Sequence, residues 1–438
     1  MVRLRNIFAL LRAQLWLLPA IMSAGAVLLA YLAITYGAAV QSLAAGDAAW
    51  WLYSGDASTA RDLLSGLLSG LITMTSLVVS VTIVILTTAA SQLGPRLITY
   101  FMGDRQIQFV LGLFIATTLY VVIVLRTLDD KLGAEGIPQA AVTVASALTI
   151  ACLFALLFYV HKIARSVIAD NLVEEVWSAL RKDIRSIAHD EAGEEGAPFF
   201  PDEKSCVPVS LARSGYIQLI DYGQLVRLGR ERGLLLRLNV RAGHFVLASN
   251  AQVDVWNAKV DDDLADTIRA AFVVGSERTP AQDIEHGLRQ LVEIGLRSLS
   301  PGINDPFTAG AVIDRLGAAL EQIFAHPPPP RFLADAGAVR VIADRSDFRG
   351  IVGAAFNQLR QSAAGHPAIL IAMAQTFGRL APACRTMEAK QALREQILRL
   401  EQTARGQDFS PCDAADVDGA ILEARAALAS QPLGGAPA

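Results

Sequence analysis

Charged side chains are what the first third of this chain most lacks. From Leu63 to Pro95 the sequence carries none, two similar stretches follow before His161, and another precedes them. About 20 apolar residues are enough to cross the roughly 30 Å hydrocarbon core of a bilayer. The whole chain of 438 residues is 53% hydrophobic and 18% charged. The missing charge therefore argues against an ordinary soluble protein and predicts a membrane domain in residues 1–162.

Cysteine and histidine are also scarce. None of the six histidines stands three to five residues from another histidine or from a cysteine, and in the nearest cluster, Asp283-Ile284-Glu285-His286, helical spacing places only Asp283 beside His286. The cysteines form no C-x-x-C pair and are scattered: Cys152, Cys206, Cys384 and Cys412. This pattern argues against a disulfide framework and against a metal site, and no cofactor is expected.

Motifs for catalysis or nucleic-acid binding are missing as well. The chain has no G-x-S-x-G motif and no glycine-rich phosphate loop after a strand. Its formal net charge is −4, and no basic stripe with interleaved aromatic residues occurs. The sequence therefore predicts neither an enzyme nor a nucleic-acid partner.

The apolar runs themselves predict four transmembrane helices. In lipid, only helices and closed barrels satisfy the backbone polar groups, and barrel strands would alternate apolar with polar residues. These runs do not alternate. The expected spans are Gln14–Tyr36, Leu67–Ala90, Ile107–Leu125 and Pro138–Val160.

Lysine and arginine near the span ends predict the orientation, because they are in excess in cytoplasmic loops. One side carries Arg3, Arg5, Arg12, Arg96, Arg105, Lys162 and Arg165. The other side carries fewer: Arg61, Arg126 and Lys131. Both termini are therefore expected in the cytoplasm. A cleaved signal peptide is disfavoured, because its apolar core would span only about 7–15 residues.

The second span carries a stripe of hydroxyl groups at helical spacing. The stripe consists of Ser65, Ser69, Thr73, Ser76, Ser80, Thr87 and Ser91. Beside it, Gly66 and Gly70 form a G-x-x-x-G pair typical of close helix packing. Two interpretations stay open. The stripe packs against another helix, or it lines a water-filled path built from several copies of the helix.

This second hydrophobic run is also too long for one straight span. As one helix, residues 63 to 95 would reach about 50 Å at 1.5 Å per residue, well beyond the hydrocarbon thickness. Gly94, Pro95 and Arg96 are expected to end or bend it at the membrane exit. No Asp, Glu, Lys, Arg or His interrupts a span core. This argues against proton-coupled transport but is compatible with passive conduction.

The remainder of the chain has the composition of a soluble, mostly helical α+β domain. Ile168, Leu172, Val176, Leu180 and Ile184 repeat every four residues and predict an amphipathic helix, either packed on its own domain or acting as a lever. The expected segments are a juxtamembrane helix and acidic linker at 163–204, an α+β module with helices at 205–326, a helical domain at 327–430 and a disordered tail at 431–438.

Two proline-containing segments predict helix starts. Thr279-Pro280-Ala281-Gln282 fits a capping box with proline at the first helical position. Ser300–Pro306 fits a helix junction, with Pro301 and Gly302 ending one helix and Asp305 capping the next ahead of Pro306. The alternative is that this loop, which also contains Asn304, binds a ligand or a neighbouring subunit.

Two segments resemble a family of bacterial membrane proteins that carries only a domain-of-unknown-function label. One is T-A-A-S-Q-L-G-P-R at Thr88–Arg96, followed by Asp104-Arg105 and Gln108. The other is R-T-P-A-Q-D at Arg278–Asp283, leading to L-S-P-G-I-N-D-P-F-T-A at Leu299–Ala309. The resemblance covers nearly the whole chain. It implies a bacterial membrane protein with a cytoplasmic extension, and it supplies no established activity or ligand. The location expected for the chain is the bacterial inner membrane.

The pattern as a whole favours a homo-oligomeric, channel-like membrane protein whose cytoplasmic domain gates or assembles it. The alternative is a non-conducting scaffold or sensor, in which the spans anchor a cytoplasmic binding module. A membrane enzyme is the third and least supported class. The expected partners are the lipid bilayer and further copies of the chain.

Overall fold

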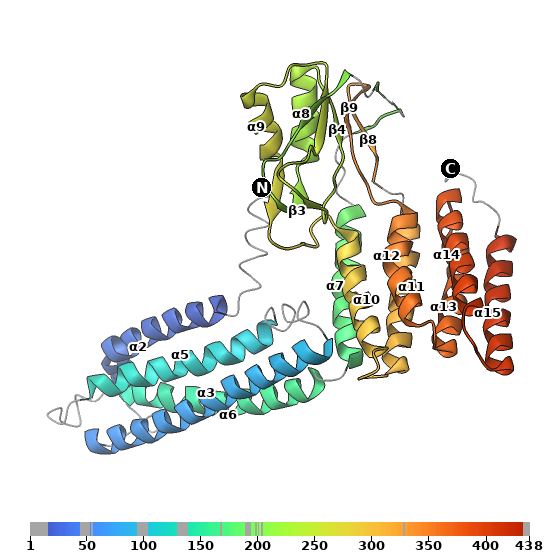
Figure 1. The fold of residues 1–438 in the computed structure, drawn as a ribbon. Coiled ribbons are helices and arrows are strands. Elements are labelled where there is room, and N and C mark those ends of the chain that lie inside the picture. Colours follow the sequence, from blue (N-terminus) through green and yellow to red (C-terminus); the bar gives the residue numbers. More distant parts are fainter. Residues whose placement is uncertain are drawn as a thin grey trace. The chain divides into compact units, whose positions relative to one another are not determined.

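The computed structural model describes residues 16–43, 53, 56–93, 104–128, 139–166, 169–188, 194–197, 199, 201–202, 205–326 and 329–431 (Figure 1). The chain divides into two compact units, Met1–Ile168 and Ala169–Ala438. We call the first the membrane unit and the second the C-terminal unit. The fold class expected from the sequence, four transmembrane helices followed by a mostly helical α+β part, is confirmed.

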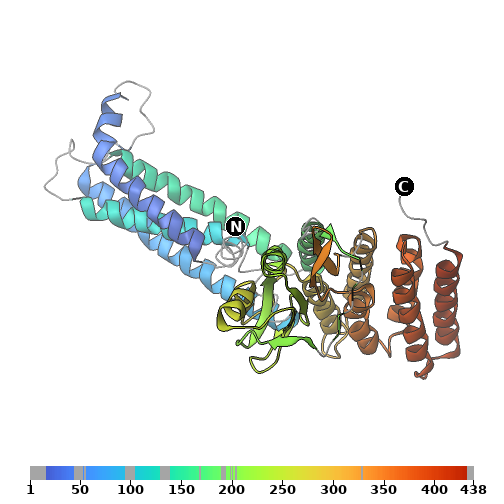
Figure 2. The same ribbon diagram turned by 90° about the horizontal axis from the view of Figure 1, so that it is seen from above.

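The membrane unit consists of four long apolar helices lying side by side (Figure 2). Each is long and apolar enough to cross a membrane, and each overlaps one of the four expected spans. The helices are α2 (Leu17–Leu43), α3 (Ala57–Leu93), α5 (Arg105–Thr127) and α6 (Gln139–Ser166).

Helix α5 is the centre of this unit and packs against α2, α3 and α6. Its apolar window is 61% buried, compared with 11% for α3. Phe114 and Tyr120 of α5 are fully buried, and the Tyr120 hydroxyl donates to the Ala141 carbonyl of α6 at 3.1 Å. Gly112 lets α2 approach closely, because a Cβ there would lie 3.2 Å from Pro19 Cα and 2.6 Å from Met22 Sδ.

Contacts at the helix ends show that α5 runs antiparallel to α3 and to α6. Asp104, just before α5, pairs with Lys162 near the end of α6 at 2.8 Å. At the other end of α5, Arg61 near the start of α3 donates to the Leu128 carbonyl, also at 2.8 Å. The start of α5 therefore lies beside the end of α6, and the start of α3 lies beside the end of α5.

The C-terminal unit contains two sheets (Figure 1). The larger has the order β1-β8-β9-β4-β6-β2, with β4 parallel to β9 and the other neighbours antiparallel. Its strands are β1 (Glu194–Glu195), β2 (Val207–Val209), β4 (Leu235–Leu238), β6 (Val253–Trp256), β8 (Phe332–Asp335) and β9 (Ala338–Ile342). Strand β1 lies within the expected linker, and the sheet joins segments on both sides of the proline run at 327–330.

The smaller sheet has the order β5-β3-β7, formed by β3 (Gly215–Ile220), β5 (Phe245–Val246) and β7 (Phe272–Gly275). Helix α8 (Tyr222–Arg232) packs on β4, β8 and β9, and α9 (Asp262–Ala270) packs on β7. One apolar core joins both sheets and both helices, with Ile217, Leu236 and Val253 fully buried.

The helical part of the C-terminal unit is a row of upright helices beside the sheets (Figure 1). Helix α10 packs on α12, α11 on α13, α12 on α14, and α15 on α13 and α14. The helices are α7 (Ala169–Ala188), α10 (Ile284–Ser298), α11 (Pro306–Phe324), α12 (Phe348–Ser362), α13 (Pro367–Leu380), α14 (Met387–Arg405) and α15 (Pro411–Ser430), with the short 3-10 turn Ala381–Ala383 after α13.

Helix α7 settles one alternative that the sequence leaves open. Its apolar residues Leu172, Val176, Leu180 and Ile184 are buried, and the helix packs against α10 and α11. The Leu180 side chain fits against Gly287, where an added Cβ would lie 2.8 Å from it. The amphipathic pattern therefore reflects packing on its own unit.

The capping box expected at Thr279–Gln282 is wrong. Helix α10 begins at Ile284, after the N-cap residue Asp283. The Thr279 hydroxyl donates to the Gln218 carbonyl of β3, and the Gln282 amide exchanges two hydrogen bonds with the Ile220 backbone at 2.9 and 3.0 Å. These side chains hold the strand, so the helix starts later.

Candidate functional site

The hydroxyl stripe lies on the outer face of α3. Leu64, Leu71 and Val78 face the other helices and are fully buried. With 3.6 residues per turn, the stripe lies about half a turn away from that buried line. Six of its side chains are described and all are exposed, namely those of Ser65, Ser69, Thr73, Ser76, Ser80 and Thr87, and the side chain of Ser91 lies outside the described residues. The stripe therefore does not pack against the part of the chain that the structure describes.

The glycine pair beside the stripe is equally uncovered. Among the described residues, no atom lies within 4 Å of a Cβ added at Gly66 or Gly70. Close helix approach inside the protomer instead uses Gly112 of α5. The expected bend at Gly94, Pro95 and Arg96 lies outside the described residues, while α3 itself runs to Leu93.

Two hydroxyls of the stripe bond to their own helix. Thr73 donates to the Ser69 carbonyl at 3.0 Å, and Thr87 donates to the Ile83 carbonyl at 2.9 Å. Such local bonds satisfy the hydroxyl hydrogen and leave oxygen lone pairs on the helix surface. The stripe is thus polar enough to attract water or a second helix.

Sequence reasoning missed the one hydroxyl that is buried among the described side chains of α3. Thr82 lies off the stripe, 8% exposed, and contacts the Tyr159 hydroxyl of α6. Both hydroxyls also donate to the Val78 carbonyl, at 2.6 and 3.2 Å. A single threonine gives no periodic signal, so only the packing of α3 on α6 reveals this contact.

The Ser300–Pro306 loop is a helix junction. The Asp305 carboxylate accepts from the Phe307 and Thr308 amides at 3.1 Å, and Pro306 opens α11. Helix α10 ends at Ser298, before Pro301 and Gly302, and Asn304 takes the left-handed conformation with φ of 48°. The hydrogen bonds from Thr308 and the two amides hold the pKa of Asp305 below its usual value. The expected capping role is thus realised.

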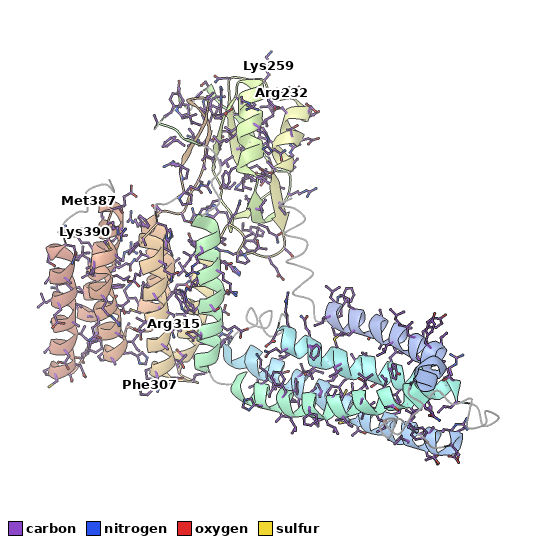
Figure 3. All side chains as sticks on the ribbon, turned by 180° about the vertical axis from the view of Figure 1, so that it is seen from behind. Arg232, Lys259, Phe307, Arg315, Met387 and Lys390 are labelled. Carbon is purple, nitrogen blue, oxygen red and sulfur yellow. The ribbon has the colours of Figure 1, made fainter. Side chains whose placement is uncertain are left out.

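The same loop exposes two apolar side chains. Ile303 is 45% exposed and Phe307, at the start of α11, is 88% exposed (Figure 3). The carboxylate of Asp305 is already engaged as a cap, so only these apolar groups and the outer polar side chains remain available to a neighbour.

A buried ion network joins the sheets to the helical row. Glu285 of α10 accepts from Arg241 at 2.9 Å and from Arg289 at 3.1 Å, and its side chain is only 7% exposed. Arg241 also lies 3.4 Å from Asp344. Burial alone would raise the pKa of Glu285, but the hydrogen bonds and charges of the two arginines outweigh it and lower that pKa.

The neighbouring pair Arg278–Asp283 completes this junction. The two side chains are 2.6 Å apart, and an added Cβ at Gly243, whose φ is 87°, would lie 2.2 Å from Asp283 Oδ2. Burial raises the pKa of Asp283 and outweighs the opposing charge of Arg278. The carboxylates of Asp283 and Glu285 therefore form ion pairs with arginines. Among the described residues, no group of three His, Cys, Asp or Glu side chains could hold a metal ion.

A polar groove opens beside this network, with a volume of about 500 Å³. We call it the α12 groove, since α12 forms its floor and α10 and α14 contribute its walls. Its charged residues are Arg241, Glu285, Arg289, Asp347, Arg349 and Arg399. Sequence reasoning missed it because the contributing residues are separated by more than a hundred positions.

Comparisons with known proteins agree with the membrane character of the chain. A family model described as "Predicted membrane protein (DUF2254)" matches residues 12–379. An uncharacterized protein of Mycobacterium tuberculosis and one of Mycobacterium bovis are each 27% identical to this chain over 436 residues, covering 96% of the chain and 82% of the relative. No solved structure matches.

Proposed function

The chain belongs to the DUF2254 family of predicted membrane proteins. We propose that several copies assemble around a central axis lined by their α3 helices and form a channel-like path across the membrane. The observation that carries this proposal is the exposed hydroxyl stripe on α3, opposite the buried line of Leu64, Leu71 and Val78. In an assembly, α3 would face the axis and the other three helices would face lipid.

Two physical arguments support this arrangement. Small residues allow helix backbones to approach closely in lipid, where no hydrophobic force drives helices together. Rings of hydroxyls then offer water and ions hydrogen-bonding partners that lipid-facing leucine or valine cannot. An α3 window only 11% buried in the protomer leaves the room that such neighbours need.

Gating by the C-terminal unit is part of the proposal. Only residues 167 and 168 separate α6 from α7, and α7 is packed into the core of the C-terminal unit. We propose that this short connection in the sequence links the C-terminal unit to the membrane helices. The proposed function involves no catalysis, cofactor or nucleic acid. The proposed partners are the lipid bilayer and further copies of the chain.

The decisive experiment separates lining from packing. Ser76→Leu and Ser80→Leu should abolish the conductance of purified protein in liposomes, because bulky apolar groups dewet a narrow path. Assembly size on a column should stay unchanged. Val122→Leu, at a lipid-exposed position of α5, is the matched control and should conduct normally.

Two outcomes would contradict the channel. Oligomers that fall apart in both serine variants would mean that the stripe packs rather than lines a path. A wild-type protein that conducts no ion at any voltage or salt tested would leave the second candidate, a non-conducting scaffold or sensor. The α12 groove favours that candidate, since it gives the C-terminal unit a place to bind a ligand.

We also propose that both termini lie in the cytoplasm of a bacterial cell, with the protein in the inner membrane. Cys152 and Cys384 are buried, so a membrane-impermeant thiol reagent should react with Cys412, which is exposed, and with Cys206. Labelling is expected only after the cells are opened. Labelling of Cys412 in intact cells, absent from Cys412→Ser, would reverse the orientation.

A further inference from the structure

The floor of the α12 groove is open because α12 carries small residues there. Gly350, Gly353 and Ala354 line it, and an added Cβ at Gly353 would lie 2.9 Å from Asn357 Nδ2. Glycine inside a helix costs about 1 kcal/mol relative to alanine. The small residues thus keep the groove open at a cost in the stability of α12.

One buried polar atom in this groove has no partner. Gln396 of α14 is 3% exposed, and its Oε1 atom makes no hydrogen bond to any described residue. The orientation of its amide follows from its neighbours. Asn357 Oδ1 accepts from Arg399 at 3.1 Å, so it also requires a donor from Gln396, and the Gln396 Nε2 atom supplies it at 3.1 Å. The Gln396 oxygen is therefore left as an acceptor facing no donor.

Arginines surround this acceptor. Arg241 and Arg289 share Glu285, and Arg349 and Arg399 share Glu395 at 2.6–2.8 Å. Asp347 is used as the N-cap of α12 and accepts from the Gly350 amide. Asp344 adds a further carboxylate beside Arg241. The four arginines and four carboxylates of this cluster balance in charge, so the groove selects by hydrogen-bond geometry more than by net charge.

Donor capacity nevertheless remains. A guanidinium offers five N–H groups. Arg289 and Arg349 are 44% and 69% exposed and direct some of these groups to solvent. Arginine recognises carboxylate and phosphate through paired hydrogen bonds. The groove thus combines exposed donors for an anion with one buried acceptor that needs an N–H or O–H group.

We propose that the α12 groove binds a small organic anion, which presents a phosphate or carboxylate to Arg289 and Arg349 and an N–H or O–H group to Gln396. The volume of about 500 Å³ lies within the range of small-molecule sites. The proposal does not depend on the channel, because all the lining residues belong to the C-terminal unit.

The test uses full-length protein in detergent and four probes: adenosine monophosphate, ribose 5-phosphate, L-glutamate and inorganic phosphate. Binding is measured by calorimetry and by the shift in unfolding temperature. At least one organic probe should bind more tightly than inorganic phosphate, because only the organic probes can also donate to Gln396.

Two variants and a control make this result specific. Gln396→Met keeps the side-chain volume and removes the unpartnered oxygen, so the protein should fold at least as well while binding weakens about tenfold or more. Arg289→Gln should weaken binding similarly. Arg379→Gln alters an exposed arginine that pairs with Asp314 away from the groove, and it should bind like the wild type.

Each contrary outcome overturns the proposal. If none of the organic probes binds, the groove is not a site for this class. If inorganic phosphate binds as tightly as the organic probes, or if Gln396→Met binds like the wild type, the Gln396 oxygen is merely hydrated and contributes nothing to recognition.

Discussion

Helices α3 and α5 have nearly the same mean hydropathy, but α5 is largely buried among the other helices and α3 is largely exposed. Their apolar windows average 2.2 and 2.4, whereas 11% of the first and 61% of the second is buried. Hydropathy therefore decides that a segment enters the bilayer and says little about what it touches there. The difference lies in which residues face inward. On α5 these are Phe114 and Tyr120, and on α3 the hydroxyl stripe faces outward.

The C-terminal unit places its polar groups differently. Its buried charges meet at junctions between elements, as Glu285 does between Arg241 and Arg289. Removing a charge from water without giving it a partner is costly, so the fold must place an opposite charge beside each buried one. In the membrane unit, two exposed hydroxyls of the stripe, those of Thr73 and Thr87, find an acceptor in a backbone carbonyl of their own helix.

The largest effect is expected from breaking the buried ion network. Glu285→Ala should cost about 3 kcal/mol of unfolding free energy, because it leaves Arg241 and Arg289 without their shared carboxylate. Removing the exposed Asp314 beside Arg379 should cost less than about 1 kcal/mol. Chemical denaturation of both variants measures the contrast. Equal losses would mean that the network does not tie the sheets to the helical row.

The next test compares two glycines of the membrane unit. Gly112→Leu should destabilise the folded protomer by about 1–3 kcal/mol, since it overpacks the contact with Pro19 and Met22. A Cβ added at Gly70 meets no described atom, so Gly70→Leu should leave protomer stability nearly unchanged and disturb only assembly. Thermal unfolding in detergent, paired with oligomer size, reports both. A Gly70 variant as unstable as the Gly112 variant would show that α3 is covered within the chain.

A smaller effect is expected at the helix junction. Asp305→Ala should cost roughly 0.5–2 kcal/mol, whereas Asp305→Asn retains a good N-cap and should cost little. The measurement is thermal unfolding of the full-length protein together with an assembly assay. If both variants lose assembly equally while the asparagine variant keeps its melting temperature, the loop has a binding role beyond capping.

The smallest effect concerns pH. Burial raises the pKa of Asp183 in α7 to about 6, with Lys182 opposing it. The folded state then binds more protons than the unfolded state between about pH 4 and 6. The contribution of Asp183 to stability should be greatest below pH 4 and should fall by about 1 kcal/mol as the pH rises through 6, after a discount for partial exposure.

Asp183→Asn should remove this dependence, so the stability difference between wild type and variant should shift in that window and stay flat above it. Unfolding free energies measured from pH 4 to 8 check this. An unchanged difference across the window would show that Asp183 titrates like an exposed aspartate.

The sequence by itself determined the four spans, the cap at Asp305 and the helix start at Pro306, because these follow from local composition. It also identified the stripe on α3, since periodicity is a local property. It failed at Thr279–Gln282, where the side chains bond to β3 instead of to a helix. Only the tertiary structure decided that the stripe faces outward, that Glu285 pairs with two arginines, and that Gln396 donates a hydrogen bond to Asn357 in a groove. Each of these depends on contacts between residues far apart in the chain, and local periodicity cannot predict such contacts.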